Sequence, residues 1–229
     1  MYIFARFYQA FGFCIDMNFE KDKIEEFGRL LSGSDNIVLV GHFNPDGDAV
    51  GSTAGLWHYL KAMGKNATIV YPNEFPLSMS PFLKDVDYLI VSCAEKAVRA
   101  ALERAELLIC LDFCTYSRTC EQIESRLQQM SCPKVVIDHH ENPDNIGLLF
   151  SDTKASSTCE LVYKILSSLD ENHITIDCAT ALYAGICTDT GSFSHSCSRR
   201  DVFDVVGDLT ERGVDIAAAG RKVIEVASY

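Results

Sequence analysis

VLVGHFNPDGDAVGSTAGLWHYL, residues 38–60, joins an apolar segment to a polar loop and a segment rich in glycine, serine and alanine. The apolar residues 37–40 predict a buried strand, and the small residues that follow the loop predict a helix. The loop carries His42, Asp46 and Asp48, and carboxylates are rarely buried without a partner. The pattern therefore indicates a divalent-metal site that needs further ligands from elsewhere. The alternative is a polar turn in which Asp48 caps the helix.

Composition limits the classes of protein that need to be considered. The chain has 229 residues, of which 48% are apolar and 23% charged, and this suits one large or two small globular domains. Its net charge of −12 excludes the basic surface of an ordinary nucleic-acid-binding protein. An acidic protein can still process phosphate esters if metal ions neutralise the phosphate locally.

The ten cysteines are scattered and form no CxxC pair. A zinc site built from Cys187, His195 and Cys197 is one interpretation of those near the C-terminus. Reduced thiols in a cytoplasmic protein are the favoured one, because disulfides are rare in that compartment. We therefore expect a cytoplasmic location.

Residues 1–16, MYIFARFYQAFGFCID, are apolar and aromatic but are interrupted by Arg6. The apolar run is too short to cross a bilayer, and it lacks the small-residue cleavage pattern of a signal peptide. We therefore expect no membrane partner. Residues 1–19 are predicted to be an extension ahead of a domain that spans residues 20–229, and Met17 is an alternative start.

Beyond the opening segment the sequence alternates between apolar runs and amphipathic segments. Strands are predicted at 37–40, 67–71, 89–93, 106–112 and 134–138. Helices are predicted from residue 21 to about 32, and at 50–63, 95–104, 123–130, 161–169, 179–186, 201–212 and 215–226. Continuous apolar strands separated by helices predict an α/β fold, a doubly wound parallel sheet with helices on both faces.

Side chains that can bind metal ions follow three of the predicted strands. Asp112 ends the strand at 106–112, and the run Asp138-His139-His140 ends the strand at 134–138. Ligands gather outside the carboxyl ends of parallel strands, so these residues should meet the first loop at one edge. Neighbouring residues there point in different directions, so one histidine can bind a metal while the other faces a substrate. Asp138 can orient either ring. Asp189, in a Thr-Asp-Thr-Gly turn, supplies a fourth acidic position.

Four segments, HFNPDGDAVGS, LLICLDF, VVIDHH and CTDTGSF, resemble in order and spacing the four motifs of the DHH phosphoesterase family. The resemblance covers residues 36–215. Within the family, the PDGDA form and the segment SSTCELVY (156–163) are most similar to the nanoRNase/pAp-phosphatase branch. That branch implies hydrolysis of very short RNA or DNA oligonucleotides, of 3′-phosphoadenosine 5′-phosphate (pAp) and, in some members, of linear or cyclic diadenylates. Type II inorganic pyrophosphatases and exopolyphosphatases are the rival enzymes, although the former usually have Thr where Gly47 stands.

The resemblance implies two divalent cations, with Mn²⁺ the expected metal and Mg²⁺, Co²⁺ or Fe²⁺ as alternatives. It divides the ligands so that His42 and Asp46 hold the first ion, Asp48, His139 and Asp189 hold the second, and Asp112 bridges both. His140 is then the expected contact to the scissile phosphate or leaving group, with Asp112 and Asp138 as the other catalytic residues. No covalent nucleophile is needed.

Substrate contacts are expected from two further places. Ser156 and Ser157 precede a predicted helix, and the spacing of Ser157 and Glu160 is that of a capping box. The helix cap is the favoured interpretation, and phosphate binding at that helix N-terminus is the alternative. Family members often carry a basic residue after the aromatic of the fourth motif, and His195 is the candidate replacement here.

Full members of the branch also carry a smaller C-terminal domain with a Gly-rich, His-containing motif, which this sequence lacks. We therefore expect a fragment of a longer protein, with a naturally reduced form as the alternative. A non-catalytic module that binds metal or nucleotide is the non-enzymatic alternative. A homodimer is compatible with the resemblance.

Overall fold

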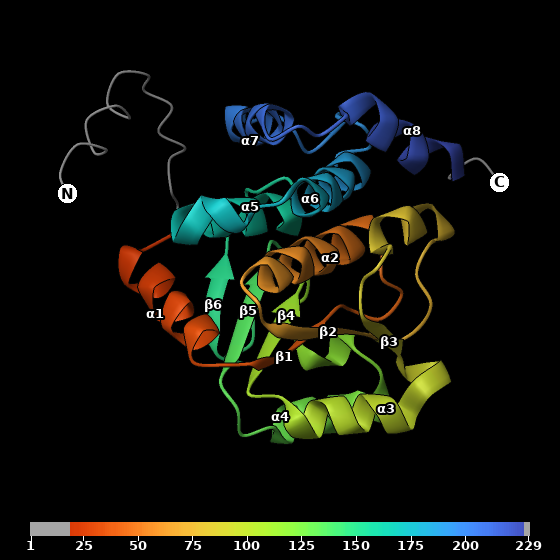
Figure 1. Ribbon diagram of the computed structural model, residues 1–229. Coiled ribbons are helices and arrows are strands. Elements are labelled where there is room, and N and C mark those ends of the chain that lie inside the picture. Colours follow the sequence, from red (N-terminus) through yellow and green to blue (C-terminus); the bar gives the residue numbers. More distant parts are fainter. Residues whose placement is uncertain (1–18, 227–229) are drawn as a thin grey trace.

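The computed structural model describes residues 19–226, so the predicted extension at residues 1–19 lies outside the described residues except for Phe19. The fold has three main layers (Figure 1), with a central sheet between two groups of helices. In the described range, no helix combines the length and apolar character needed to cross a membrane.

Six parallel strands form the sheet, in the spatial order β3-β2-β1-β4-β5-β6. Their bounds are β1 Asn36–Val40, β2 Asn66–Tyr71, β3 Tyr88–Ile90, β4 Leu107–Leu111, β5 Lys134–Asp138 and β6 Leu148–Ser151. The order reverses between β1 and β4, which lie side by side at the centre. This is the switch point at which doubly wound sheets leave a crevice for ligands. The predicted α/β fold class is confirmed.

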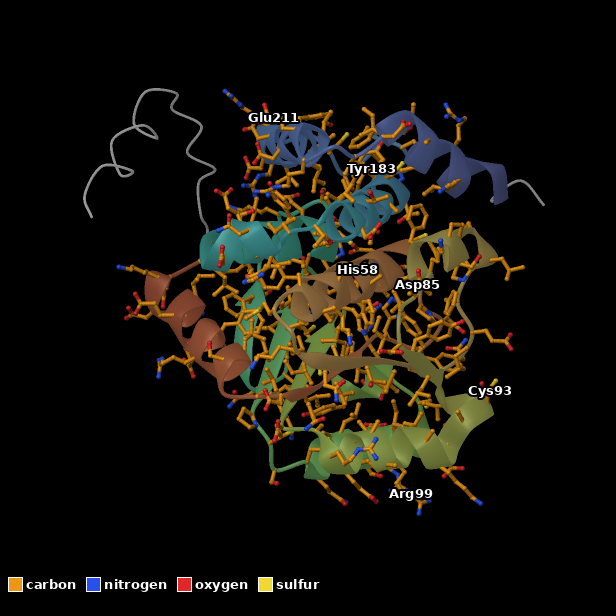
Figure 2. All side chains as sticks on the ribbon, viewed as in Figure 1. His58, Asp85, Cys93, Arg99, Tyr183 and Glu211 are labelled. Carbon is orange, nitrogen blue, oxygen red and sulfur yellow. The ribbon has the colours of Figure 1, made fainter. Side chains whose placement is uncertain are left out.

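Helices cover both faces, as the sequence predicts. On one face lie α2 (Gly47–Ala62), α5 (Thr158–Asp170) and α6 (Ile176–Asp189), and on the other α3 (Val91–Arg104) and α4 (Glu121–Gln129). The remaining helices are α1 (Lys21–Ser32), α7 (Arg200–Glu211), α8 (Ile216–Val226) and the short 3₁₀ turns η2 (Leu77–Leu83), η3 (Tyr116–Arg118) and η4 (Glu171–His173). Figure 2 shows side chains filling the space between α2 and the sheet, whereas Arg99 on α3 points away from the sheet.

The alternation of side chains along β1 explains both apolar layers. Ile37 and Leu39 belong to the core under α2, α5 and α6, while Val38 and Val40 belong to the core under α3 and α4. Successive strand residues point to opposite faces, so a strand covered on both sides must be apolar throughout.

Helices α2 and α6 approach each other closely because glycines line their contact. A Cβ atom at Gly51 would lie 2.8 Å from the carbonyl oxygen of Ala181 and 2.9 Å from Gly185 Cα, and one at Gly185 would lie 3.2 Å from the carbonyl oxygen of Gly47. Only glycine permits such a backbone approach. The contact brings the end of α6, with Asp189, toward the start of α2.

Two differences from the sequence prediction concern strands. The strand predicted at 89–93 ends at Ile90, and α3 begins at Val91 with a kink at Ala94 (φ −140°, ψ 39°). Strand β6 was not predicted, because four residues at a sheet edge show too little periodicity to be recognised.

Candidate metal centre

The loop after β1 presents His42 with one ring nitrogen available. Its Nδ1 lies 2.8 Å from the carbonyl oxygen of Phe43, and since a carbonyl can only accept, Nδ1 carries the proton of this hydrogen bond. Nε2 is buried without a hydrogen-bond partner, 3.3 Å from Asp112 Oδ2 and 3.7 Å from Asp46 Oδ1. Burial lowers the pKa of His42, but the carboxylates of Asp112 and Asp46 outweigh it and raise that pKa to about 10. A nitrogen so placed is typical of a metal ligand oriented by a backbone carbonyl.

Asp46 is the N-cap of α2, because its Oδ1 accepts the backbone N–H groups of Asp48 and Ala49, each at 3.0 Å. The alternative in which Asp48 caps this helix is therefore wrong. The helix also begins three residues before the predicted residue 50, at Gly47. Since the cap uses only Oδ1 of Asp46, Oδ2 remains available to bind a metal ion.

Asp48 is buried and supports a different helix. Its Oδ2 accepts the N–H of Thr158 at 2.6 Å and its Oδ1 accepts the N–H of Cys159 at 2.9 Å, both in the first turn of α5. Burial first, and then the charges of Asp112 and Asp189, raise the pKa of Asp48 well above its ordinary value. A nearby cation would relieve this repulsion.

Asp112 lies at the centre of the cluster, at the end of β4. Its backbone has φ 64°, in the left-handed region that Asp tolerates better than most residues, and its N–H donates to the carbonyl of Ile137. Its Oδ1 accepts a hydrogen bond from Thr158 Oγ1 at 2.9 Å and lies 3.7 Å from His139 Nε2. Its other oxygen faces His42, so one carboxylate reaches both halves of the site.

The two histidines after β5 face different partners. His139 Nε2 lies 3.6 Å from Asp189 Oδ2 and 3.8 Å from Asp48 Oδ2. His140 Nδ1 donates to the fully buried Asp138 Oδ1 at 2.7 Å. This hydrogen bond is the main reason that the pKa of His140 is raised.

Three groups within the described residues bring potential metal-ligand atoms within 4.8 Å of one another: His42, Asp46 and Asp112; Asp48, His139 and Asp189; and Asp112, His139 and His140. The first two contain the residues that the family resemblance assigns to the two ions, and Asp112, the expected bridging residue, belongs to the first and third groups. In the third, His140 Nδ1 is already engaged by Asp138, so this nitrogen is not free for a metal. Mixed imidazole and carboxylate ligands suit Mn²⁺ and similar divalent ions.

Asp189, at the end of α6, completes the second group. Burial first raises its pKa, the charges of Asp112 and Asp46 add to this, and the pKa reaches about 6 although His139 acts in the opposite direction. The crowding of carboxylates and the orphaned His42 Nε2 both fit a centre that holds cations.

The predicted substrate contacts, Ser156, Ser157 and His195, belong to none of these ligand groups. Ser157 is fully buried, and its hydroxyl accepts the N–H of Glu160 as the N-cap of α5, while Glu160 accepts the N–H of Ser156. Since Asp48 occupies the next two N–H groups, the geometry favours the helix cap over phosphate binding. Ser156 is buried too, and its hydroxyl has no hydrogen-bond partner. His195 is exposed and packs against Gly191, two residues beyond Asp189.

The alternative zinc site gains no support in residues 19–226. Cys187 Sγ lies 3.6 Å from Ser192 Oγ, and Cys197 Sγ lies 3.2 Å from the carbonyl oxygen of Phe193. Neither cysteine belongs to a described group of metal-ligand atoms.

A cavity of about 300 Å³ between α3 and α4 lies at the opposite edge of the sheet. It is lined by Arg99, Arg126 and residues 129–132, which precede the amino end of β5. It therefore does not contribute to the metal centre.

Sequence reasoning missed Thr158 as a partner of the site. Its N–H and its hydroxyl bind two different candidate ligands, Asp48 and Asp112. The available signal was the position of Thr158 directly after an N-cap serine, and that signal pointed only to helix capping.

Comparison with known proteins agrees with this geometry. Residues 36–186, more than half of the chain, match the DHH family, N-terminal domain. The bifunctional oligoribonuclease and PAP phosphatase NrnA of Bacillus subtilis is 30% identical over 191 residues, which cover 81% of this chain and 56% of NrnA. The cyclic-di-AMP phosphodiesterase GdpP of Bacillus subtilis is 30% identical over 197 residues, covering 81% of this chain and 29% of GdpP.

A solved structure is also similar. The crystal structure of an exopolyphosphatase-related protein from Bacteroides fragilis matches with a TM-score of 0.86 and 30% identity, covering 90% of this chain and 61% of that chain. This chain thus spans about half the length of the first of these relatives, NrnA. With the four motifs, the shared sheet and the family match over residues 36–186, the chain belongs to the DHH family.

Proposed function

We propose that the chain is the metal-binding part of a phosphoesterase that hydrolyses short oligonucleotides, pAp or both. The observation that carries the proposal is the pair of ligand groups, His42/Asp46/Asp112 and Asp48/His139/Asp189. The Asp112 carboxylate lies between them, with Oδ2 3.3 Å from His42 Nε2 and Oδ1 3.7 Å from His139 Nε2. The relative NrnA is an oligoribonuclease and PAP phosphatase, which supports this substrate class.

Two divalent cations, with Mn²⁺ as the proposed metal, would be held by these six residues. When bound, they would polarise a phosphoryl oxygen and activate water for in-line attack at phosphorus. The protein's own contribution is to hold the ligands at fixed positions, through the Phe43 carbonyl behind His42 and the start of α5 behind Asp48.

His140 is the proposed proton donor to the leaving oxygen. Because Nδ1 is engaged by Asp138, Nε2 is the atom that can carry a proton toward the substrate. Asp138 favours the protonated ring and raises the pKa of His140, so a larger fraction of His140 is imidazolium at neutral pH. Asp138 acts as a positioning residue, since it is fully buried.

Arg118 is the proposed contact for a substrate phosphate beside the centre. It lies in η3, six residues after Asp112, and it forms no ion pair with a carboxylate of the described residues. Its carbonyl accepts the N–H of Phe43, the residue after His42, at 2.7 Å, and its positive charge acts against the raised pKa of His140. A cation here offsets the repulsion between an anionic substrate and the carboxylates.

Two other enzyme functions have a specific observation behind them. The relative GdpP is a cyclic-di-AMP phosphodiesterase, and the similar structure from Bacteroides fragilis is exopolyphosphatase-related. The non-enzymatic alternative is a module that binds metal or nucleotide without turnover.

An assay with a panel of four substrates distinguishes these functions. The 229-residue protein is offered pAp, the dinucleotide pApA, cyclic diadenylate and pyrophosphate, each with Mn²⁺ or EDTA. The proposal expects Mn²⁺-dependent release of phosphate from pAp or cleavage of pApA, and loss of both in Asp112→Asn. Cleavage of pyrophosphate alone assigns the chain to the rival enzymes, and bound Mn²⁺ without any turnover favours the binding module.

A further inference from the structure

Phe43 is a large, exposed aromatic residue in the loop between β1 and α2, residues 41–46, which we call the metal loop. Its side chain is 46% exposed, although it directly follows the candidate ligand His42. Its N–H donates to the carbonyl of Arg118 at 2.7 Å, and its own carbonyl accepts from His42 Nδ1 at 2.8 Å. Both backbone polar groups are therefore fixed by residues of the site.

The next residue fixes the loop from the other side. Asn44 has φ 54°, its N–H donates to Asn73 Oδ1 at 2.6 Å, and its own Oδ1 accepts from Asn73 Nδ2 at 2.9 Å. This reciprocal pair ties the loop to the end of β2. Hydrogen bonds on both sides thus hold the backbone of Phe43 in place.

Single exposed apolar residues are common on protein surfaces and by themselves indicate nothing. Phe203 on α7, for example, is 51% exposed and lies outside the metal loop. Phe43 differs because its backbone is bonded to a candidate metal ligand and to Arg118. Consecutive Cα atoms are about 3.8 Å apart. The Cα atoms of Phe43 and His42 are therefore closer together than the length of one nucleotide.

We propose that Phe43 is the surface on which a nucleobase of the substrate stacks, and that it makes the site selective for nucleotides over inorganic phosphates. The proposal rests on the phosphoesterase function proposed above. An aromatic face accepts any base, because every base has a π-face. The arrangement therefore selects for the presence of a base and leaves its identity open.

Binding of AMP and of ribose 5-phosphate, measured by calorimetry in Mn²⁺, isolates the contribution of the base. Wild-type protein should bind AMP about 5- to 150-fold more tightly than ribose 5-phosphate, the range expected for one stacked base. Phe43→Ala should lose most of this advantage and bind ribose 5-phosphate as before. Phe43→Trp should retain it, and AMP should quench the new fluorescence, because the chain's own Trp57 is buried. Phe203→Ala is the matched control and should change neither affinity.

Three binding results would overturn the stacking role of Phe43: equal wild-type affinities for AMP and ribose 5-phosphate, unchanged AMP affinity in Phe43→Ala, or an equal loss for both ligands in that variant. The comparison requires no turnover, so its failure is distinct from that of the proposed function. If wild type and Phe43→Ala hydrolyse pAp with the same KM, the phosphoesterase function is supported and the stacking role of Phe43 is contradicted.

Discussion

The carboxylate of Asp48 accepts the backbone N–H of Thr158 at 2.6 Å, although 110 residues separate the two in the sequence. The hydroxyl of Thr158 donates to Asp112 at 2.9 Å, so one residue of α5 touches a candidate ligand of each ion. Negative charge is favourable at a helix N-terminus, and here the carboxylate comes from another helix. The position of the ligands therefore depends on how α5 packs against the start of α2.

Thr158→Val should weaken metal binding while preserving side-chain shape. The substitution removes the hydrogen bond that orients Asp112, and loss of such a supporting contact typically costs about 10- to 100-fold in metal affinity or activity. Calorimetric titration with Mn²⁺ measures the change. Thr210→Val, at an exposed threonine of α7, is the control and should bind Mn²⁺ like the wild type.

Mn²⁺ should stabilise the folded chain, because the crowded carboxylates repel each other without a cation. At a concentration about 100-fold above Kd, binding contributes about 2.7 kcal/mol, or roughly 5–10 °C in Tm for a domain of this size. Asp112→Asn should lose most of the shift, and its φ of 64° suits Asn as well as Asp. A thermal melt with Mn²⁺ that equals the melt with EDTA would contradict the metal centre.

Gly185→Ala should destabilise the protein by about 1–3 kcal/mol through overpacking. The new methyl group would lie 2.2 Å from Cys159 Sγ and 3.3 Å from Asp48 Oδ1, so Mn²⁺ affinity should fall as well. Gly207→Ala provides the matched comparison, since no atom lies within 4 Å of its added Cβ in α7. That variant should be more stable by about 0.5–1 kcal/mol. Urea unfolding of both variants with EDTA tests the contrast.

Asp201→Asn should destabilise the protein at neutral pH only. Burial acts to raise the pKa of Asp201, but Lys164 and Arg199 outweigh it and lower that pKa. A folded-state pKa below the unfolded value adds stability above about pH 3.9, which is lost as pH falls through the folded pKa. We expect a loss of about 0.5–1 kcal/mol at pH 7 that shrinks as pH falls below about 3.9 and vanishes below the folded-state pKa of Asp201. Asp204→Asn, on the same helix, should show little change at either pH in urea titrations.

Arg118→Met should raise KM for pAp about five- to tenfold while leaving Mn²⁺ affinity unchanged, because the proposed role of Arg118 is to contact a substrate phosphate and not a metal ion. The effect should shrink at high salt, which screens exposed charges. Arg104→Met, at the exposed end of α3 near the amino ends of the strands, is the control. An equal change in both variants would mean that only net charge matters.

Much of the site could be predicted because each motif follows an apolar run. Buried strands such as residues 134–138 must be apolar on both faces, and a polar residue directly after one lies at the carboxyl edge. His42, Asp112 and His139 could thus be placed at one edge from the sequence alone. The capping of α2 by Asp46 was harder to assign, because Asp46 and Asp48 are both compatible with an N-cap position in the sequence.

The amino-acid sequence by itself therefore determined the α/β class, the covered parallel sheet and the edge at which the acids and histidines meet. Apolar periodicity reports burial, which is a local property of each segment. Only the tertiary structure decided that Asp48 accepts N–H groups at the start of α5, that the Cys159 side chain packs against Gly185, and that Phe43 is exposed. Each of these depends on contacts between distant segments, whose geometry follows from how the helices pack and leaves no periodic trace in the chain.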